Sequence, residues 1–124
     1  MTRSWVLRSE GARPLTMNKV AGQLHRQKWA AHTKASRSEW STLAMIGKVP
    51  TLDAITIDVT PLHKNKRSPQ DVAACAPEAK AAIDGLVDRG VIPDDTAAHL
   101  LSVTFHQPRI AGVDGMELRI VEVT

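Results

Sequence analysis

Four charged side chains in the second half of the chain could take part in chemistry together. The carboxylates of Asp71, Asp94 and Asp95 flank a predicted helix in the sequence, and Lys80 lies within that helix. Carboxylate oxygens are the ligands that Mg²⁺ and Mn²⁺ prefer, and metal-assisted hydrolysis of a phosphate ester needs several of them close to the phosphate. The pattern is therefore compatible with a metal-dependent nuclease.

Each of these residues also has a structural interpretation, which the sequence leaves open. Asp71 could cap a turn, and Pro93–Thr96 could form a β-turn or the N-cap of a short helix. Lys80 lies within about one turn of the start of its helix, where the helix dipole disfavours a cation. Such a residue is either functional or held by an i,i+4 ion pair, here with Asp84.

The sequence does not indicate other kinds of catalytic or metal site. It contains no glycine-rich phosphate loop, no Cys-x-x-Cys pair and no His-Glu-x-x-His motif. The five histidines lack zinc-site spacing, and we expect His99 and His106 to be ordinary polar residues at strand ends. Cys75, the single cysteine, is predicted to be a packed side chain rather than a nucleophile.

The charges are distributed unevenly along the chain, although the formal net charge is only +3. Residues 1–67 contain twelve Lys and Arg against four Asp and Glu, whereas residues 68–124 contain four against nine. A basic segment suits DNA, because each phosphate that it neutralises releases counterions. The alternative is that both halves are merely solvated. The predicted DNA-binding residues in the basic half are Lys19, Arg26, Lys28, Lys34, Arg37, Lys64, Lys66 and Arg67.

The hydrophobic pattern predicts a single α/β (α+β) domain over residues 1–124, with the element order β-α-β-α-β-β. The first helix is expected to begin at Ser36 or Ser38, after a basic loop, and to end at Gly47, while the second runs from Pro77 to Gly90. The last two strands are expected to pair as an antiparallel hairpin. The predicted result is a mixed sheet with both helices on one side, its strands at 4–8, 55–59, 101–105 and 116–120.

Composition indicates a soluble protein of a reducing compartment, the cytoplasm. No apolar stretch approaches the roughly 18 residues that a membrane-spanning helix needs. The first fifteen residues have three arginines and no continuous hydrophobic region, unlike a secretory signal. One cysteine cannot form an internal disulfide.

The segment from Lys80 to Asp95 resembles the signature of RusA-type endodeoxyribonucleases. It reads Lys-Ala-Ala-Ile-Asp-Gly-Leu-Val-Asp-Arg-Gly-Val-Ile-Pro-Asp-Asp. The shared features are a lysine, two small residues, an apolar residue, Asp-small-Leu, a glycine-ended helix and an Asp-Asp pair. Pro14 and Asn18 are similar to the Pro/Asn segment that precedes a basic helix in this family. The similarity is specific over about residues 70–124 and diffuse before them.

This resemblance implies a RusA-like fold and a homodimeric Holliday-junction resolvase that cuts branched double-stranded DNA at four-way junctions. Mg²⁺ is the implied cofactor, and Mn²⁺ can substitute. Such enzymes are often encoded by phages or prophages, which would place the protein in a bacterial host cytoplasm. The resemblance makes Asp95 a metal ligand with Asp94 beside it, places Lys80 at the scissile phosphate, and adds Asn18 to the DNA-binding residues. Asp71 completes both the expected metal ligands and the expected catalytic set of Asp71, Lys80 and Asp95.

The chain departs from the family pattern at one place. The family has an Asp-x-Asp four to six residues before its lysine, where this sequence has Ala76 and Ala74. Asp71 is the available substitute, nine residues before Lys80, and Glu78 could add an oxygen. Two alternatives therefore stay open beside the nuclease: a catalytically inactive resolvase-fold protein that binds DNA, and a protein-interaction domain.

Overall fold

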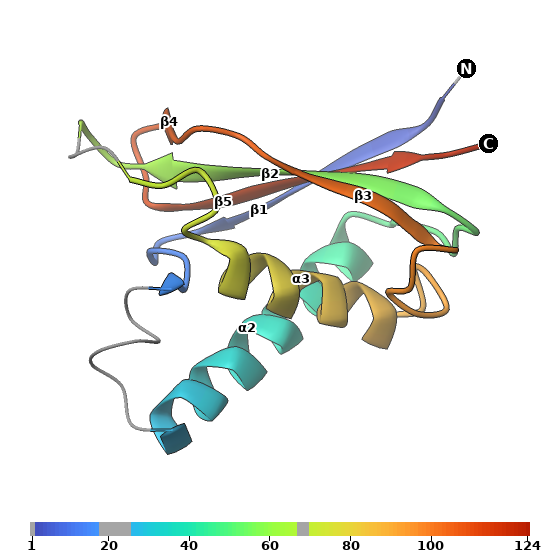
Figure 1. Ribbon diagram of the computed structural model, residues 1–124, viewed down its shortest axis with the longest axis horizontal. Helices are drawn as coiled ribbons and strands as arrows, with labels where there is room; N and C mark the ends of the chain where they lie inside the picture. Colours follow the sequence, from blue (N-terminus) through green and yellow to red (C-terminus); the bar gives the residue numbers. More distant parts are fainter. Residues whose placement is uncertain (1, 18–25, 67–69) are drawn as a thin grey trace.

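The computed structural model describes residues 2–17, 26–66 and 70–124 (Figure 1). In these residues the chain forms a mixed sheet and two helices, as predicted for a small α+β domain. The elements are β1 (Ser4–Glu10), α2 (Arg26–Ile46), β2 (Ile55–His63), α3 (Ala76–Asp88), β3 (Leu100–Phe105), β4 (Arg109–Ile110) and β5 (Gly115–Glu122). The two-residue strand β4 is an addition to the expected order.

The strands of the sheet follow the order β1-β5-β2-β3, and β4 also pairs with β2. β5 runs antiparallel to both β1 and β2, whereas β3 and β4 run parallel to β2. The predicted hairpin of the last two long strands is therefore wrong. The helix α3 connects β2 to β3, and such a crossover returns the chain in its original direction, so β3 joins β2 in parallel. β5 instead fills the position between β1 and β2.

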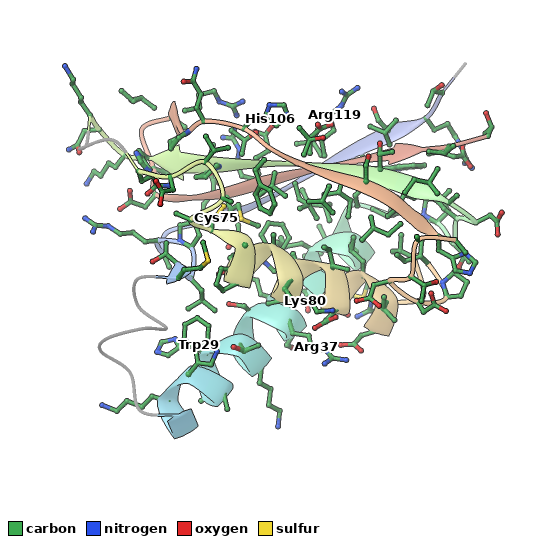
Figure 2. All side chains as sticks on the ribbon, in the orientation of Figure 1. Trp29, Arg37, Cys75, Lys80, His106 and Arg119 are labelled. Atoms are coloured by element: carbon green, nitrogen blue, oxygen red, sulfur yellow. The ribbon has the colours of Figure 1, made fainter. Side chains whose placement is uncertain are left out.

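Both helices lie on one face of the sheet, as expected (Figure 1). Strand alternation sends the side chains of Ile57, Val59 and Leu118 into the core beneath the helices, where each is at most 1% exposed. Their neighbours along the strands point to the opposite face, as Figure 2 shows for Arg119, and no described helix covers that face. The sheet thus has one apolar face and one polar face.

The helix α2 begins at Arg26, ten residues before the predicted start at Ser36. The residues between these positions include several good helix formers, Ala and Lys among them, and neither Gly nor Pro, so helix propensity extends the element. Its end was predicted correctly. The helix ends at Ile46, and the Gly47 amide closes the last turn by donating to the Leu43 carbonyl. Neither described helix is long and apolar enough to cross a membrane.

The helix α3 begins one residue before and ends two residues before the predicted limits of Pro77 and Gly90, and it packs very closely on α2. Pro77 lies in its first turn, and Gly90 leaves the helix with a φ of 78°. A Cβ atom placed on Gly85 would lie 2.5 Å from the Arg37 carbonyl oxygen, which is closer than any real contact. Only glycine permits this approach of the two helix backbones, and the approach fixes the position of α3 against α2.

Glu78 joins three parts of the fold through one buried carboxylate that is 7% exposed. Its oxygens accept hydrogen bonds from the Leu15 amide at 3.1 Å, the Ser36 hydroxyl at 3.3 Å and the Trp40 indole Nε1 at 2.9 Å. The segment after β1, the helix α2 and the helix α3 are therefore held at one point. Hydrogen bonds to a buried charged group are stronger than those between neutral groups.

Replacing Glu78 by Gln is expected to destabilise the fold, because an amide nitrogen cannot accept a hydrogen bond from any of the three donors. At least one buried donor would lose its acceptor, which costs about 1.5–3 kcal/mol of unfolding free energy. Urea unfolding followed by circular dichroism measures this loss. Glu10→Gln on the exposed surface of β1 is the matched control and should change stability by less than about 0.5 kcal/mol. Equal stabilities of the two variants would contradict this role of Glu78.

Candidate functional site

Lys80 lies on α3 between two carboxylates. Its ammonium group is 3.0 Å from an oxygen of Asp84, one helical turn further on, and 2.5 Å from an oxygen of Asp95 in the connection to β3. The predicted ion pair with Asp84 is thus present, and Asp95 is a second partner. These contacts compensate a cation in the early part of a helix, where the dipole opposes it. They hold the pKa of Lys80 above its ordinary value, mainly through the hydrogen bond to Asp95.

The connection after α3 positions Asp95 through a local turn. An oxygen of Asp94 accepts hydrogen bonds from the Thr96 amide at 2.9 Å and from the Thr96 hydroxyl at 2.5 Å. These bonds lower the pKa of Asp94. This arrangement is the turn-forming role that the sequence left open for the Asp-Asp pair, and it presents the next side chain, Asp95, to Lys80.

Asp71 is exposed and begins the turn that precedes α3. In this turn the Ala74 amide donates to the Asp71 carbonyl at 3.0 Å. No interaction joins its carboxylate to Asp94 or Asp95 within the described residues. In that part of the chain no three His, Cys, Asp or Glu side chains gather closely enough to hold a metal ion. The expected ligands Asp71, Asp94 and Asp95 therefore do not form a ready metal site in this arrangement, and metal binding stays a prediction.

Two side chains at the start of α3, those of Cys75 and Glu78, are buried and have a structural role. Glu78 is buried and already accepts three hydrogen bonds, so the suggestion that it adds an oxygen to a metal site does not fit its position. Cys75 is completely buried, and burial raises the pKa of its thiol to about 11. A thiol of this kind is not a nucleophile at neutral pH, in agreement with its predicted packing role.

The predicted DNA-binding residues fall into two groups in space. Lys28, Lys34 and Arg37 are exposed on α2, whereas Lys64 and Lys66 are exposed beyond the end of β2. Figure 1 shows that the two groups lie on different sides of the molecule. The first lies in the helix layer, and the second lies beyond the end of β2. Asn18, Lys19, Arg67 and the side chain of Arg26 lie outside the described residues.

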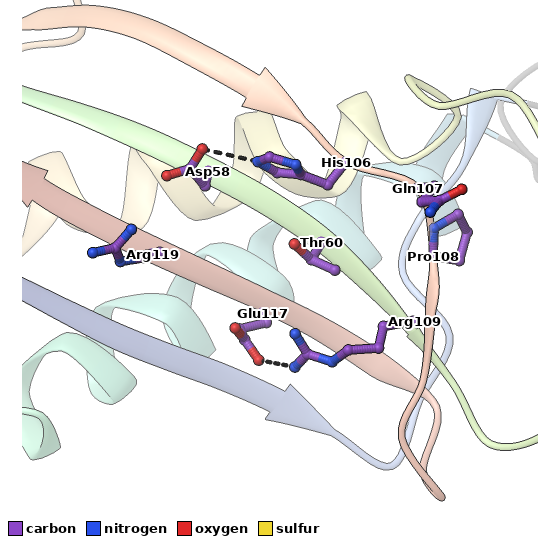
Figure 3. A pocket seen from close by; sticks show the side chains of 8 residues that line it. All are labelled: Asp58, Thr60, His106, Gln107, Pro108, Arg109, Glu117 and Arg119. Atoms are coloured by element: carbon purple, nitrogen blue, oxygen red, sulfur yellow. Dashed lines mark hydrogen bonds and ion pairs between the residues drawn. The ribbon is translucent and has the colours of Figure 1, made fainter.

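A polar concavity on the open face of the sheet was missed by sequence reasoning (Figure 3). It has a volume of about 450 Å³ and is lined by Asp58, Thr60, His106, Gln107, Pro108, Arg109, Glu117 and Arg119. His106 bonds to Asp58 at 2.9 Å, and Glu117 accepts hydrogen bonds from both Arg8 and Arg109. The bonds of His106 to Asp58 and of Arg8 to Glu117 span 48 and 109 positions, so no local pattern could have revealed them. His106 is the strand-end residue that we expected, with a carboxylate partner added.

No protein-family model matches the sequence, and no curated protein matches it. The resemblance to RusA-type enzymes therefore rests on the residues quoted for it.

The contact between Lys80 and Asp95 predicts a measurable titration. The hydrogen bond from Lys80, with its charge as the next contribution, holds the pKa of Asp95 below the ordinary value of 3.8. Since the lowered pKa favours the charged carboxylate in the fold, this contribution to stability is present above pH 3.8 and is lost as the pH falls through the folded pKa. In Lys80→Met the pKa of Asp95 should rise toward 3.8.

Carboxyl ¹³C NMR across the acid pH range measures the pKa values of Asp94 and Asp95 in one sample. Asp94 is the internal control, because Thr96 rather than Lys80 lowers its pKa, and its titration should not change in the Lys80→Met variant. An unchanged Asp95 titration would show that the ion pair is absent in solution.

Proposed function

We propose that this protein is a structure-selective endodeoxyribonuclease that resolves four-way DNA junctions, as RusA-type enzymes do. The observation that carries the proposal is the contact between Lys80 and Asp95. These two residues are separated by fifteen positions and belong to the segment that resembles the RusA signature. The fold brings the lysine and the second aspartate of the Asp-Asp pair together, which is what a shared role at one phosphate requires.

Lys80 supplies the positive charge in this proposal. Its side chain is 61% exposed, so a phosphate of the DNA backbone can approach it from solvent. A fixed cation next to a phosphodiester stabilises the charge that develops on the phosphate oxygens during hydrolysis. Asp84 and Asp95 both contact the Lys80 ammonium group, and Asp95 is the one that belongs to the Asp-Asp pair of the RusA-like segment.

The proposed cofactor is Mg²⁺ or Mn²⁺, with Asp71, Asp94 and Asp95 as the proposed ligands. The present arrangement does not bring these three oxygens together, so they would have to converge when DNA binds. The proposal also includes a homodimer, because paired incisions on a two-fold symmetric junction suit a two-fold symmetric enzyme. It places the protein in the cytoplasm, in a bacterial host if a phage encodes it.

A second candidate function is DNA binding without cleavage. The specific observation that favours it is the separation of Asp71 from Asp94 and Asp95, in a chain that also has Ala74 and Ala76 in place of the family's Asp-x-Asp. Such a protein would keep the resolvase fold and its basic surface but would have no metal-dependent activity.

Incubation of the purified protein with end-labelled four-way junctions and Mg²⁺ or Mn²⁺ tests the proposal directly. We expect paired nicks at symmetric positions. Removal of the fixed charge in Lys80→Met should slow cleavage by about 100-fold or more, and Asp95→Asn should have an effect of the same order. Asp53→Asn is the matched control, because the Asp53 side chain is 96% exposed in the loop before β2. It should cleave at the native rate.

The other outcomes of this experiment assign the alternatives. Salt-sensitive binding of junctions in EDTA, without nicks in either metal, would establish the binding-only function. Cleavage that persists in both Lys80→Met and Asp95→Asn would contradict the proposed site. Absence of any DNA affinity at low salt would indicate a protein-interaction domain.

A further inference from the structure

A second basic site lies between the two helices, on the side away from the sheet. It is a concavity of about 500 Å³ lined by residues from the middle of α2 and from the end of α3. We call it the α2–α3 cradle and define it by Lys34, Arg37, Ser38, Ser41, Thr42, Asp88 and Arg89. In Figure 2 the labelled side chains of Arg37 and Lys80 lie in the same helix layer, so the cradle and the Lys80 site share one side of the molecule.

The cradle is built by the close contact of α2 with α3. At Gly85 the two backbones approach so closely that a Cβ would collide with the Arg37 carbonyl. Arg37 then donates two hydrogen bonds across the helices to Asp88, at 2.5 and 2.7 Å. Arg89 donates through Nε to the carbonyl and the hydroxyl of Ser41, at 3.2 and 3.3 Å. The walls of the cradle are thus held in place by the fold.

The cradle has more positive charge than its carboxylate can neutralise. Asp88 is its only acid and is bound by Arg37. Lys34 is exposed and has no carboxylate partner among the described residues. The Nε atom of Arg89 is bonded, but in the same residues no partner occupies its two terminal amino groups. Two cations are therefore uncompensated in a hollow that also offers hydroxyl groups.

These donors match the oxygens of a phosphate. The two terminal amino groups of an arginine form a planar fork that fits two phosphate oxygens. A lysine ammonium adds charge, and the exposed hydroxyls of Ser38 and Thr42 lie one turn apart on α2 and can donate to a third oxygen. The concavity on the open face of the sheet differs, because its two carboxylates, Asp58 and Glu117, equal its two arginines in number.

One face of α3 connects the cradle to the candidate site. Lys80, Asp84 and Asp88 follow one another at intervals of four residues, and the charge of Asp84 acts on Arg37 as well as on Lys80. Eight residues advance about 12 Å along an α-helix. Neighbouring phosphates of one DNA strand are further apart than the axial rise of about 3.4 Å, because the strand also winds around the axis, so this distance spans only a few nucleotides.

We propose that the α2–α3 cradle binds a second phosphate of the DNA backbone, within a few nucleotides of the phosphate at Lys80. The inference rests on the proposed function for the identity of the ligand as DNA. It adds Arg89, Ser38 and Thr42, none of which the sequence predicted to contact DNA, to the DNA-contacting residues. It also assigns Arg37 a supporting position, because its guanidinium is already bound to Asp88.

The first test measures DNA binding in EDTA at several KCl concentrations, by fluorescence anisotropy with a labelled duplex and a labelled junction. Loss of one phosphate contact makes the slope of log K against log salt shallower by about 0.9. We expect this change in Lys34→Ala and in Arg89→Ala. Arg119→Ala on the open face of the sheet is the matched control and should retain the native slope. Arg89→Lys, which keeps the charge, should recover most of the slope, and thermal unfolding verifies that all variants fold.

The second test locates the contact on the DNA. A neutral methylphosphonate is placed at one phosphate at a time, from the first to about the fourth on either side of the cleavage site, in otherwise identical junctions. It should weaken native binding at one of these positions and have no further effect on Arg89→Ala, because the contact is already lost there. Equal weakening of both proteins would place the cradle elsewhere on the DNA and overturn the inference.

The outcomes separate the inference from the proposed function. If the native protein binds DNA but Lys34→Ala and Arg89→Ala keep its salt slope, the inference alone is wrong. If the native protein binds neither the duplex nor the junction at low salt, the proposed function is wrong and the inference fails with it. NMR shifts at Arg89 on addition of inorganic phosphate, with an unchanged DNA slope in Arg89→Ala, would assign the cradle to free phosphate and also overturn the inference.

Discussion

The contact of α3 with α2 is the constraint on which the rest of the structure depends. Gly85 removes the side chain that would separate the helices, and the small buried residues Ala81 and Ala82 lie on the same helix. α3 can therefore pack against α2 as well as against the sheet. Because Lys80 and Asp88 belong to this helix, the packing that stabilises the core also sets the positions of the charged groups. A shift of α3 would move the candidate site and the cradle together.

The sequence predicted the elements much better than their partners. Alternation at Ile55, Ile57 and Val59 reveals which face of a strand is buried, and Pro77 and Gly90 mark the ends of α3. Alternation carries no information about which strand lies next to another, so β3 was paired with β5 instead of β2. The early start of α2 was missed because the cap-like serines near position 36 lie inside a stretch whose composition is itself helical.

The residues of the candidate site could likewise be recognised from local patterns, whereas their long-range partners could not. An unusual placement such as Lys80 in the early part of a helix can be recognised from one segment, and two carboxylates compensate it in the fold. Glu78 was considered as a possible extra oxygen for a metal site, whereas the donors that it binds come from residues up to 63 positions away. The bond between Arg89 and Ser41 spans 48 positions. Contacts of this range depend on how helices cross, which residue spacing along one helix does not encode.

The Lys80 site and the α2–α3 cradle differ in how far carboxylates compensate their positive charges. This difference indicates what each site would contribute to DNA binding. Lys80 is shared by Asp84 and Asp95, so a phosphate that approaches it must compete with two carboxylates. The cradle offers Lys34 and the terminal amino groups of Arg89 without such competition. Most of the attraction for the backbone would therefore come from the cradle. A phosphate held at Lys80 would in turn weaken the hold of the ammonium on Asp95, and would free that carboxylate beside the phosphate where the proposed chemistry needs it.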